Sequence, residues 1–190
     1  MLNFLVFLEA AFRNNLSRFK GALLKIYLLF HGCKVGKGLK CAGFPYFKGF
    51  PNHNIVIGNH VDLGRNNTFE LSKKGKIIME DYVLLHQNIL ISCSSQIIFR
   101  KWSGVAENVS IRDSNHMFVK NEYFRKQEII SEPIEIGEGA GIGAGSVVLM
   151  GSKIGTGVFI GSNSLVTRKS EMEDYGIYAG NPLRLIGRRT

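Results

Sequence analysis

The sequence has little proline, few cysteines and no long hydrophobic run. It contains 4 prolines but 22 glycines in 190 residues, a composition that indicates many regular tight corners rather than a flexible linker. The three cysteines, Cys33, Cys41 and Cys93, form no CxxC pair and leave an odd one, which favours reduced thiols in a cytoplasmic protein. Neither apolar stretch near the N-terminus reaches the ~20 residues of a membrane-spanning helix.

Acidic residues are also scarce relative to basic ones. The chain has 24 Lys and Arg but only 15 Asp and Glu, so its net charge is +9. This balance favours an anionic partner: nucleic acid, a phosphate-bearing cofactor or an anionic membrane surface. The aromatic residues do not interleave with a basic stripe, which argues against nucleic acid.

Residues 1–30 are predicted to form an amphipathic helical cap. Four apolar residues share one face at helical spacing: Phe4, Phe7, Leu8 and Ala11. The favoured interpretation is a helix that packs on its own protein. The alternative is a helix that lies on a membrane and directs its cations toward lipid phosphates. These cations are Arg13, Arg18, Lys20 and Lys25.

The fold is indicated by a repeat of six residues. Aliphatic residues recur at Ile136, Ile142, Val148, Ile154, Ile160 and Val166, and glycine follows four of them. A period of six does not hold one face of a helix. The same spacing occurs upstream in three blocks, namely Ile57, Leu63 and Phe69, then Ile78, Leu84 and Leu90, then Phe99, Val105 and Ile111. The pattern predicts a solenoid of short strands with these residues in its core.

Residues 133–189, PIEIGEGAGIGAGSVVLMGSKIGTGVFIGSNSLVTRKSEMEDYGIYAGNPLRLIGRR, resemble the C-terminal half of the hexapeptide-repeat acyltransferases. The resemblance extends over about residues 35–190 and is nearest to galactoside, maltose and surface-polysaccharide O-acetyltransferases. It implies an all-β solenoid, a left-handed parallel β-helix with 18 residues per coil. We therefore expect a helical cap at 1–30 and a β-helix domain at 31–190. A loop insertion at 117–135 and a C-terminal tail from residue 170 would interrupt and end the repeat.

The resemblance implies that His116 is the catalytic base. It stands at the end of VSIRDSNH, just before the insertion. In the family this histidine removes the proton of the acceptor hydroxyl as that oxygen attacks the acetyl thioester, in a ternary complex without a covalent intermediate. Asp113 could fix the tautomer of His116 from behind, as a carboxylate does in hydrolase triads.

The resemblance also implies acetyl-coenzyme A as co-substrate, bound between adjacent β-helices of a homotrimer. The contacts carried over by position are Ala144, Ser162, Thr167, Arg168 and Arg184. A solvated surface is the alternative interpretation of the basic residues. Many relatives have a tryptophan where this chain has Gly141, which changes one wall of the site.

Two further assignments concern the acceptor and metals. Asn88 matches a sugar-contacting asparagine of the family, but an asparagine ladder at a coil corner explains it equally well. Relatives that bind zinc carry a second histidine five residues after the first, whereas this chain has Asn121 there. We therefore expect no metal site.

The sequence thus predicts an acetyl-CoA-dependent O-acetyltransferase that acts on a sugar hydroxyl of a surface polysaccharide or its precursor. Its expected location is the cytoplasm, at the inner face of the membrane if the helical cap contacts lipid. The alternatives are an N-acetyltransferase on an amino-sugar nucleotide or another small acceptor, and a non-catalytic scaffold. An N-terminal βαβ unit with GxGxxG, usual in the first alternative, is missing at residues 1–30. His116 and the basic C-terminal segment argue against a scaffold.

The positive charge of the chain leads us to expect that acidic or lipid-pyrophosphate-linked acceptors are used better than neutral sugars.

Overall fold

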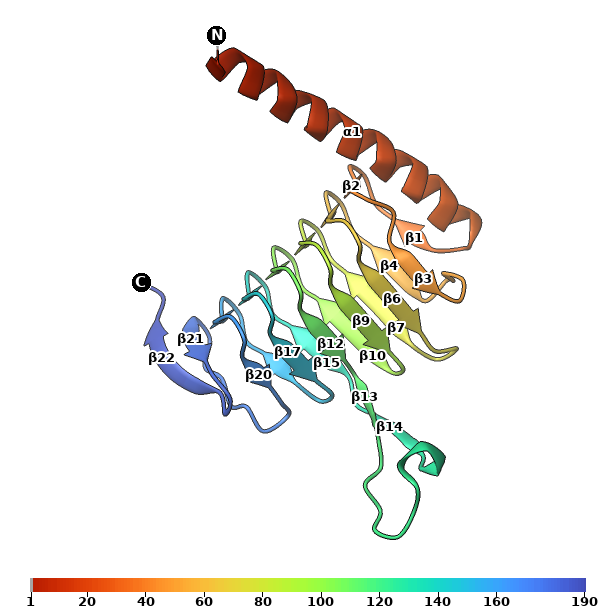
Figure 1. Cartoon of the computed structure of the whole chain (residues 1–190), viewed down its shortest axis with the longest axis vertical. Helices are drawn as coiled ribbons and strands as arrows, with labels where there is room; N and C mark the ends of the chain where they lie inside the picture. Colours follow the sequence, from red (N-terminus) through yellow and green to blue (C-terminus); the bar gives the residue numbers. More distant parts are fainter. Residues whose placement is uncertain (1) are drawn as a thin grey trace.

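The computed structural model describes residues 2–190 as a parallel β-solenoid of about seven turns with one N-terminal helix, consistent with the predicted left-handed β-helix (Figure 1). Helix α1 (Leu2–Phe30) lies across the first coil, and the last strands close the other end. Each coil contributes one short strand to each of three sheets, so hydrogen bonding runs along the stack from coil to coil.

From β1 to β20, apart from the separate hairpin strands β13 and β14, successive strands rotate between the three sheets, and β21 and β22 then both join the second sheet. The first sheet contains β1 (Lys34–Val35), β4 (Ile55–Ile57), β7 (Lys76–Met79), β10 (Gln96–Phe99), β15 (Ile134–Ile136) and β18 (Lys153–Ile154). The second contains β2 (Lys40–Cys41), β5 (Asp62–Leu63), β8 (Leu84–Leu85), β11 (Gly104–Val105), β16 (Gly141–Ile142), β19 (Phe159–Ile160), β21 (Gly176–Ala179) and β22 (Arg184–Arg188). The third contains β3 (Tyr46–Lys48), β6 (Thr68–Leu71), β9 (Leu90–Cys93), β12 (Ser110–Arg112), β17 (Val147–Leu149) and β20 (Leu165–Val166).

The length of a coil changes along the solenoid. Glu135 pairs with Lys153, a separation of 18 residues, as the family repeat implies. In the earlier coils Ile55 pairs with Ile77 and Ile77 with Ile97, separations of 22 and 20 residues. The extra residues lie at the corner that follows each strand of the third sheet. That corner therefore accepts insertions without disturbing the strands.

The core positions predicted from the repeat are confirmed in all blocks but one. The six aliphatic residues from Ile136 to Val166 are buried, as are the blocks that begin at Ile57 and Phe99. In the third coil the prediction is wrong by one residue: Met79, Leu85 and Ile91 are buried instead of Ile78, Leu84 and Leu90. Both neighbours are apolar at each of these places, so the spacing fits either register, and a slip of one residue exchanges the two faces of a strand.

Helix α1 packs one face on the first coil. Leu24 and Leu28 are buried, and the Lys25 ammonium donates to the Gly36 carbonyl at 2.8 Å. A Cβ at Gly21 would stand 2.0 Å from the Leu39 carbonyl oxygen, so only glycine permits this close approach. The side chains of Phe4, Phe7 and Leu8, on which the predicted apolar face rests, lie outside the described residues. Within residues 2–190, no helix is both long enough and apolar enough to cross a membrane.

The insertion forms a hairpin that leaves the solenoid after β12 (Figure 1). Strand β13 (Ser114–His116) pairs antiparallel with β14 (Ile129–Ser131), and the 3-10 turn η1 (Phe124–Lys126) lies between them. The hairpin thus begins before the predicted boundary of residue 117, and β15 resumes the repeat at Ile134. The C-terminal boundary also differs, because β21 continues the second sheet parallel to β19 before β22 turns back antiparallel.

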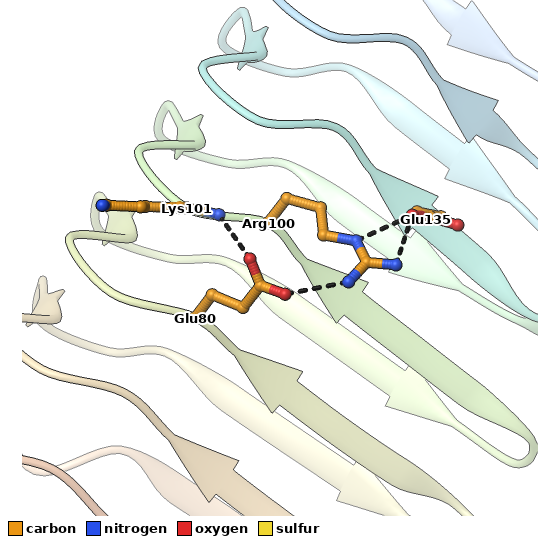
Figure 2. A network of polar contacts seen from close by, with 4 residues as sticks. All are labelled: Glu80, Arg100, Lys101 and Glu135. Carbon is orange, nitrogen blue, oxygen red and sulfur yellow. Dashed lines mark hydrogen bonds and ion pairs between the residues drawn. The ribbon is translucent and has the colours of Figure 1, made fainter.

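An ion-pair network on the first sheet joins the coils on both sides of this hairpin (Figure 2). The Arg100 guanidinium donates to Glu80 at 2.9 Å and to Glu135 at 2.7 Å, and the Lys101 amide donates to Glu80 at 3.0 Å. The carboxylates of Glu80 and Glu135 raise the pKa of Arg100. Arg100 precedes the hairpin and Glu135 follows it, so the network holds together the two coils from which the hairpin extends.

Candidate active site

His116, the predicted base, lies at the end of β13 where the hairpin leaves the solenoid. Its imidazole is half-buried and packs against the ring of Phe124, with centroids 4.4 Å apart. The Nδ1 atom lies 3.3 Å from the backbone carbonyl oxygen of Gln127. A carbonyl can only accept, so this hydrogen bond requires the proton on Nδ1 and leaves the lone pair on Nε2. In the neutral imidazole, that is the tautomer that can accept a proton at Nε2.

Gln127 is the residue that organises this hairpin. Its side chain is buried, its Oε1 accepts from the Val119 amide at 2.8 Å, and its Nε2 donates to the carbonyls of Val119 and Glu122 at 3.1 and 3.0 Å. These bonds fix the carbonyl that His116 meets. Gln127 was not predicted from the sequence, because it belongs to no motif and its partners are backbone atoms of an irregular loop.

Asp113 makes other contacts than the one suggested by analogy with hydrolase triads. Its carboxylate is fully buried and accepts from the amides of Ser94 and Ser95 at 2.6 and 2.8 Å. Among the hydrogen bonds of the described residues, none joins Asp113 to His116. Asp113 thus closes the corner between β9 and β10, and the expected direct contact with the imidazole is not formed. Burial, followed by the Asp113 charge, raises the pKa of the neighbouring Cys93 thiol.

A hollow of about 230 Å³ opens at the base of the hairpin, directly beside His116 in the chain. Its lining combines β12 and the start of the hairpin with the corners of the two following coils. The lining residues are Arg112, Ser114, Asn115, Leu149, Met150, Thr167 and Arg168. The structure therefore brings two of the predicted cofactor residues, Thr167 and Arg168, to the surface from which His116 extends.

Arg168 is held in place at this hollow by an ion pair. Its guanidinium donates to Glu132 at 2.7 Å, and both side chains remain about half exposed. Glu132 follows β14, so the pair connects the last residue of the hairpin to the corner after β20. The Thr167 hydroxyl lies 3.4 Å from that of Ser170 within the same corner.

The other predicted cofactor residues lie elsewhere on the last coils. Ala144 precedes β17 and Ser162 precedes β20, and the Ala144 carbonyl accepts from the Asn163 amide at 2.8 Å. These two residues and Thr167 thus flank the surface formed by β17 and β20. Arg184 begins β22, opposite Ala179, and is exposed. Within one chain, therefore, Arg184 does not line the hollow.

Asn88 lies in a column of asparagines at the corner between the second and third sheets. Asn66, Asn88 and Asn108 all have φ near +60°, and the side-chain Nδ2 of Asn88 donates to Oδ1 of Asn108 at 3.2 Å. Asparagine tolerates this left-handed conformation better than most residues. Strand β9 separates Asn88 from the corner on the hairpin side. These contacts fit the asparagine-ladder interpretation, and a contact of Asn88 with a sugar stays a prediction.

The place of the missing tryptophan is covered by another ring. A Cβ at Gly141 would stand 2.8 Å from the ring of Phe159, which lies one coil further along the second sheet. Phe159 thus covers the surface that Gly141 leaves open. In the part of the chain that the structure describes, no group of three or more His, Cys, Asp or Glu side chains could hold a metal ion.

Comparisons with known proteins agree with this architecture. Residues 133–168 match the family model "Bacterial transferase hexapeptide (six repeats)". A search of curated protein sequences found no significant match. The repeat resemblance inferred from the sequence is therefore confirmed over these residues.

Several solved structures share the fold. AntD, an N-acyltransferase from Bacillus cereus solved with dTDP and 3-hydroxybutyryl-CoA, has a TM-score of 0.75 and 21% identity, over 90% of this chain and 88% of AntD. The polysialic acid O-acetyltransferase OatWY has a TM-score of 0.62 and 18% identity, over 82% and 81% of the two chains. A maltose O-acetyltransferase from Clostridium difficile 630 has a TM-score of 0.52 and 22% identity, over 85% and 72%. At these identities the likeness is one of fold.

Proposed function

We propose that this chain, which carries the hexapeptide repeat and its fold, is an acyltransferase that moves acetyl from acetyl-coenzyme A to a sugar hydroxyl. The observation that carries the proposal is the contact between His116 Nδ1 and the Gln127 carbonyl, which leaves Nε2 of the neutral imidazole to act as a base. The preceding residue, Asn115, lines the hollow together with Arg112 and Arg168. The acyltransferases among the similar structures support the reaction class.

In the proposed mechanism, His116 Nε2 takes the proton of the acceptor hydroxyl while that oxygen bonds to the thioester carbonyl carbon. The tetrahedral intermediate then collapses, and its carbon–sulfur bond breaks. The departing sulfur takes the proton from the imidazolium, which yields the O-acetyl sugar, free coenzyme A thiol and neutral His116. The Gln127 carbonyl stabilises the imidazolium during this step, because it accepts from Nδ1–H throughout.

Acetyl-coenzyme A is proposed to lie along the surface of β17 and β20, near Ala144, Ser162 and Thr167. Arg168 and Arg184 would then bind its phosphates. One β-helix offers one wall of such a groove, so we expect a homotrimer in which a neighbouring chain supplies the second. Complexes of AntD with coenzyme A or an acyl-CoA support an acyl-CoA co-substrate. A cytoplasmic location stays a prediction from the free thiols.

The second candidate is an N-acyltransferase that acts on an amino-sugar nucleotide. AntD, which was also solved with dTDP-4-amino-4,6-dideoxyglucose, is more similar in fold to this chain than the two O-acetyltransferases named above. The match covers 88% of AntD, itself an N-acyltransferase, so the finding of a helix instead of a βαβ unit at residues 2–30 does not separate the two candidates. The polysialic acid enzyme supports a glycan hydroxyl as the acceptor.

A thiol-release assay with acetyl-CoA separates the candidates. The acceptors are a neutral sugar, an acidic oligosaccharide and an amino-sugar nucleotide, and mass spectrometry locates the acetyl group. We expect an O-acetyl product and a faster rate with the acidic glycan than with the neutral sugar. The difference between the two rates should become smaller as ionic strength rises. Exclusive N-acetylation of the nucleotide would replace the first candidate by the second. If no thiol were released with any of the three acceptors, with acetyl-CoA or with another acyl-CoA, both candidates would be contradicted.

A further inference from the structure

Helix α1 carries a second apolar face besides the one that packs on the solenoid. Six large apolar side chains on it are 38% to 89% exposed: Phe12, Leu16, Phe19, Leu23, Ile26 and Phe30. They are spaced by alternating steps of four and three residues, so they form one continuous stripe along the helix. We call this set the outer stripe. Such a large exposed apolar patch marks a surface that binds a partner or a membrane.

The outer stripe points away from the rest of the chain. The packing side of α1 is marked by Gly21, Leu24 and Leu28, which are buried against the first coil. At 3.6 residues per turn, the centre of the outer stripe lies about 150° around the helix from that side. Tyr27 and Leu29 are also exposed and widen the apolar surface. Packing on the solenoid, which was the favoured sequence interpretation, therefore accounts for only one of the two faces.

Cations line both flanks of α1 where the helix meets the solenoid. A hollow of about 420 Å³ on one flank is lined by Arg18 and Lys25 together with Lys40. A hollow of about 660 Å³ on the other contains Arg13, Lys20, Lys40 and Arg65, with Asp62 as its one acidic residue. The helix sequence itself holds four basic residues and a single acid, Glu9, which pairs with Arg13. Both edges of the apolar face are therefore positive.

This charge distribution decides between two occupants of the outer stripe. A second copy of the helix would pack against a stripe of this spacing, but it would bring four more basic residues and only one acid to the contact. An anionic bilayer offers an apolar interior to the stripe and phosphates to the cations at both edges. Long basic side chains beside a helix can reach the headgroups while their stems stay on apolar surface.

We propose that α1 binds the surface of an anionic membrane, in the bilayer plane, with the outer stripe among the acyl chains and Arg13 and Arg18 at the phosphates. The ammonium groups of Lys20 and Lys25 donate to the Ala42 and Gly36 carbonyls of the solenoid and add positive charge behind them. The solenoid then extends from the membrane into solution. Strand β12, from which the hairpin leaves, lies three coils from the helix-bound coil, about 15 Å along the stack. This inference does not depend on the proposed reaction.

The test is flotation of the full chain with vesicles of phosphatidylcholine alone and with phosphatidylglycerol added. We expect binding to the anionic vesicles, weakened when ionic strength rises from about 0.1 M to about 1 M. The double variant Phe12→Glu, Phe19→Glu should lower the bound fraction at least about tenfold, since it removes two phenyl groups that would enter the bilayer. The matched control Phe118→Glu, Ile186→Glu adds the same charge at exposed sites on other elements and should bind as the parent does. Circular dichroism checks that both variants are folded.

Two results would overturn the proposal. The first is equal flotation of the parent and the Phe12→Glu, Phe19→Glu variant, since the outer stripe would then not contact lipid. The second is a parent that does not float, but whose mass by light scattering falls from an oligomer to a monomer in the same variant. That result would assign the outer stripe to a contact between copies of the chain.

Discussion

His116 and Gln127 form the contact on which the proposed chemistry depends. Only the first was foreseeable, because a histidine at the end of a regular hexad before an insertion matches a family position. Gln127 could not be predicted, since its role depends on how the loop from Met117 to Lys126 folds around its side chain. Likewise, Asp113 was suggested as the partner of His116 by analogy with hydrolase triads, and the sequence does not determine where a carboxylate points.

Replacing Gln127 tests its role as a positioning residue. Gln127→Ala removes the bonds to Val119 and Glu122, so the loop no longer fixes the carbonyl at His116 Nδ1. We expect kcat to fall roughly 10- to 100-fold. The KM for acetyl-CoA should change little, and the pH profile of kcat should shift. Steady-state kinetics across pH checks this. Glu128→Ala, exposed and one residue away, is the control, and equal behaviour of the two variants would contradict the assignment.

Arg168 and Arg184 are predicted to bind the cofactor. Removing either should raise the KM for acetyl-CoA while the KM for the acceptor stays nearly constant, and added salt should weaken cofactor binding more in the parent than in the variants. Kinetics with each substrate varied in turn measures both constants. Lys153→Ala, exposed on β18 of the same coil as Arg168, is the control. Unchanged acetyl-CoA constants in both arginine variants would assign these residues to the solvated surface.

At the level of strands and corners, the repeat predicted the core-facing residues most reliably in its longest uninterrupted run. From Ile136 to Val166 the six aliphatic residues at the predicted spacing are all buried. The third coil has paired apolar residues, such as Leu84 with Leu85, so the spacing alone could not choose the face. The hairpin begins before the expected residue 117 because residues 111–116 fit a complete hexad, while the partner strand of Ser114 lies at the far end of the insertion.

The corner between β9 and β10 depends on Asp113. Asp113→Ala leaves the buried amides of Ser94 and Ser95 without their acceptors, so the free energy of unfolding should fall by about 1–3 kcal/mol or more. Urea unfolding measures this directly. Ser92→Ala, on β9 of the same corner, provides a nearby comparison that leaves the carboxylate in place. If Asp113→Ala kept full stability but lost activity, the direct role at His116 first predicted for it would be restored.

Across the whole molecule, three free thiols are enclosed in the core, at Cys33, Cys41 and Cys93. Burial raises the pKa of Cys41 to about 11. In the unfolded chain this thiol titrates near pH 8.5. The stability that the folded chain gains by burying the neutral thiol is therefore complete below pH 8.5 and is lost as pH rises toward 11. The urea midpoint should therefore fall between pH 8 and pH 10, and fall less in Cys41→Ala. An equal fall in the two proteins would contradict this.

The central claim is that His116 is the base of an acyl transfer from acetyl-CoA. The most direct measurement compares thiol release by the parent and by His116→Ala, with acetyl-CoA affinity measured in parallel by calorimetry. The account predicts a fall in turnover of roughly 10²–10⁴-fold with nearly unchanged cofactor affinity. Near-parental turnover in His116→Ala would contradict it.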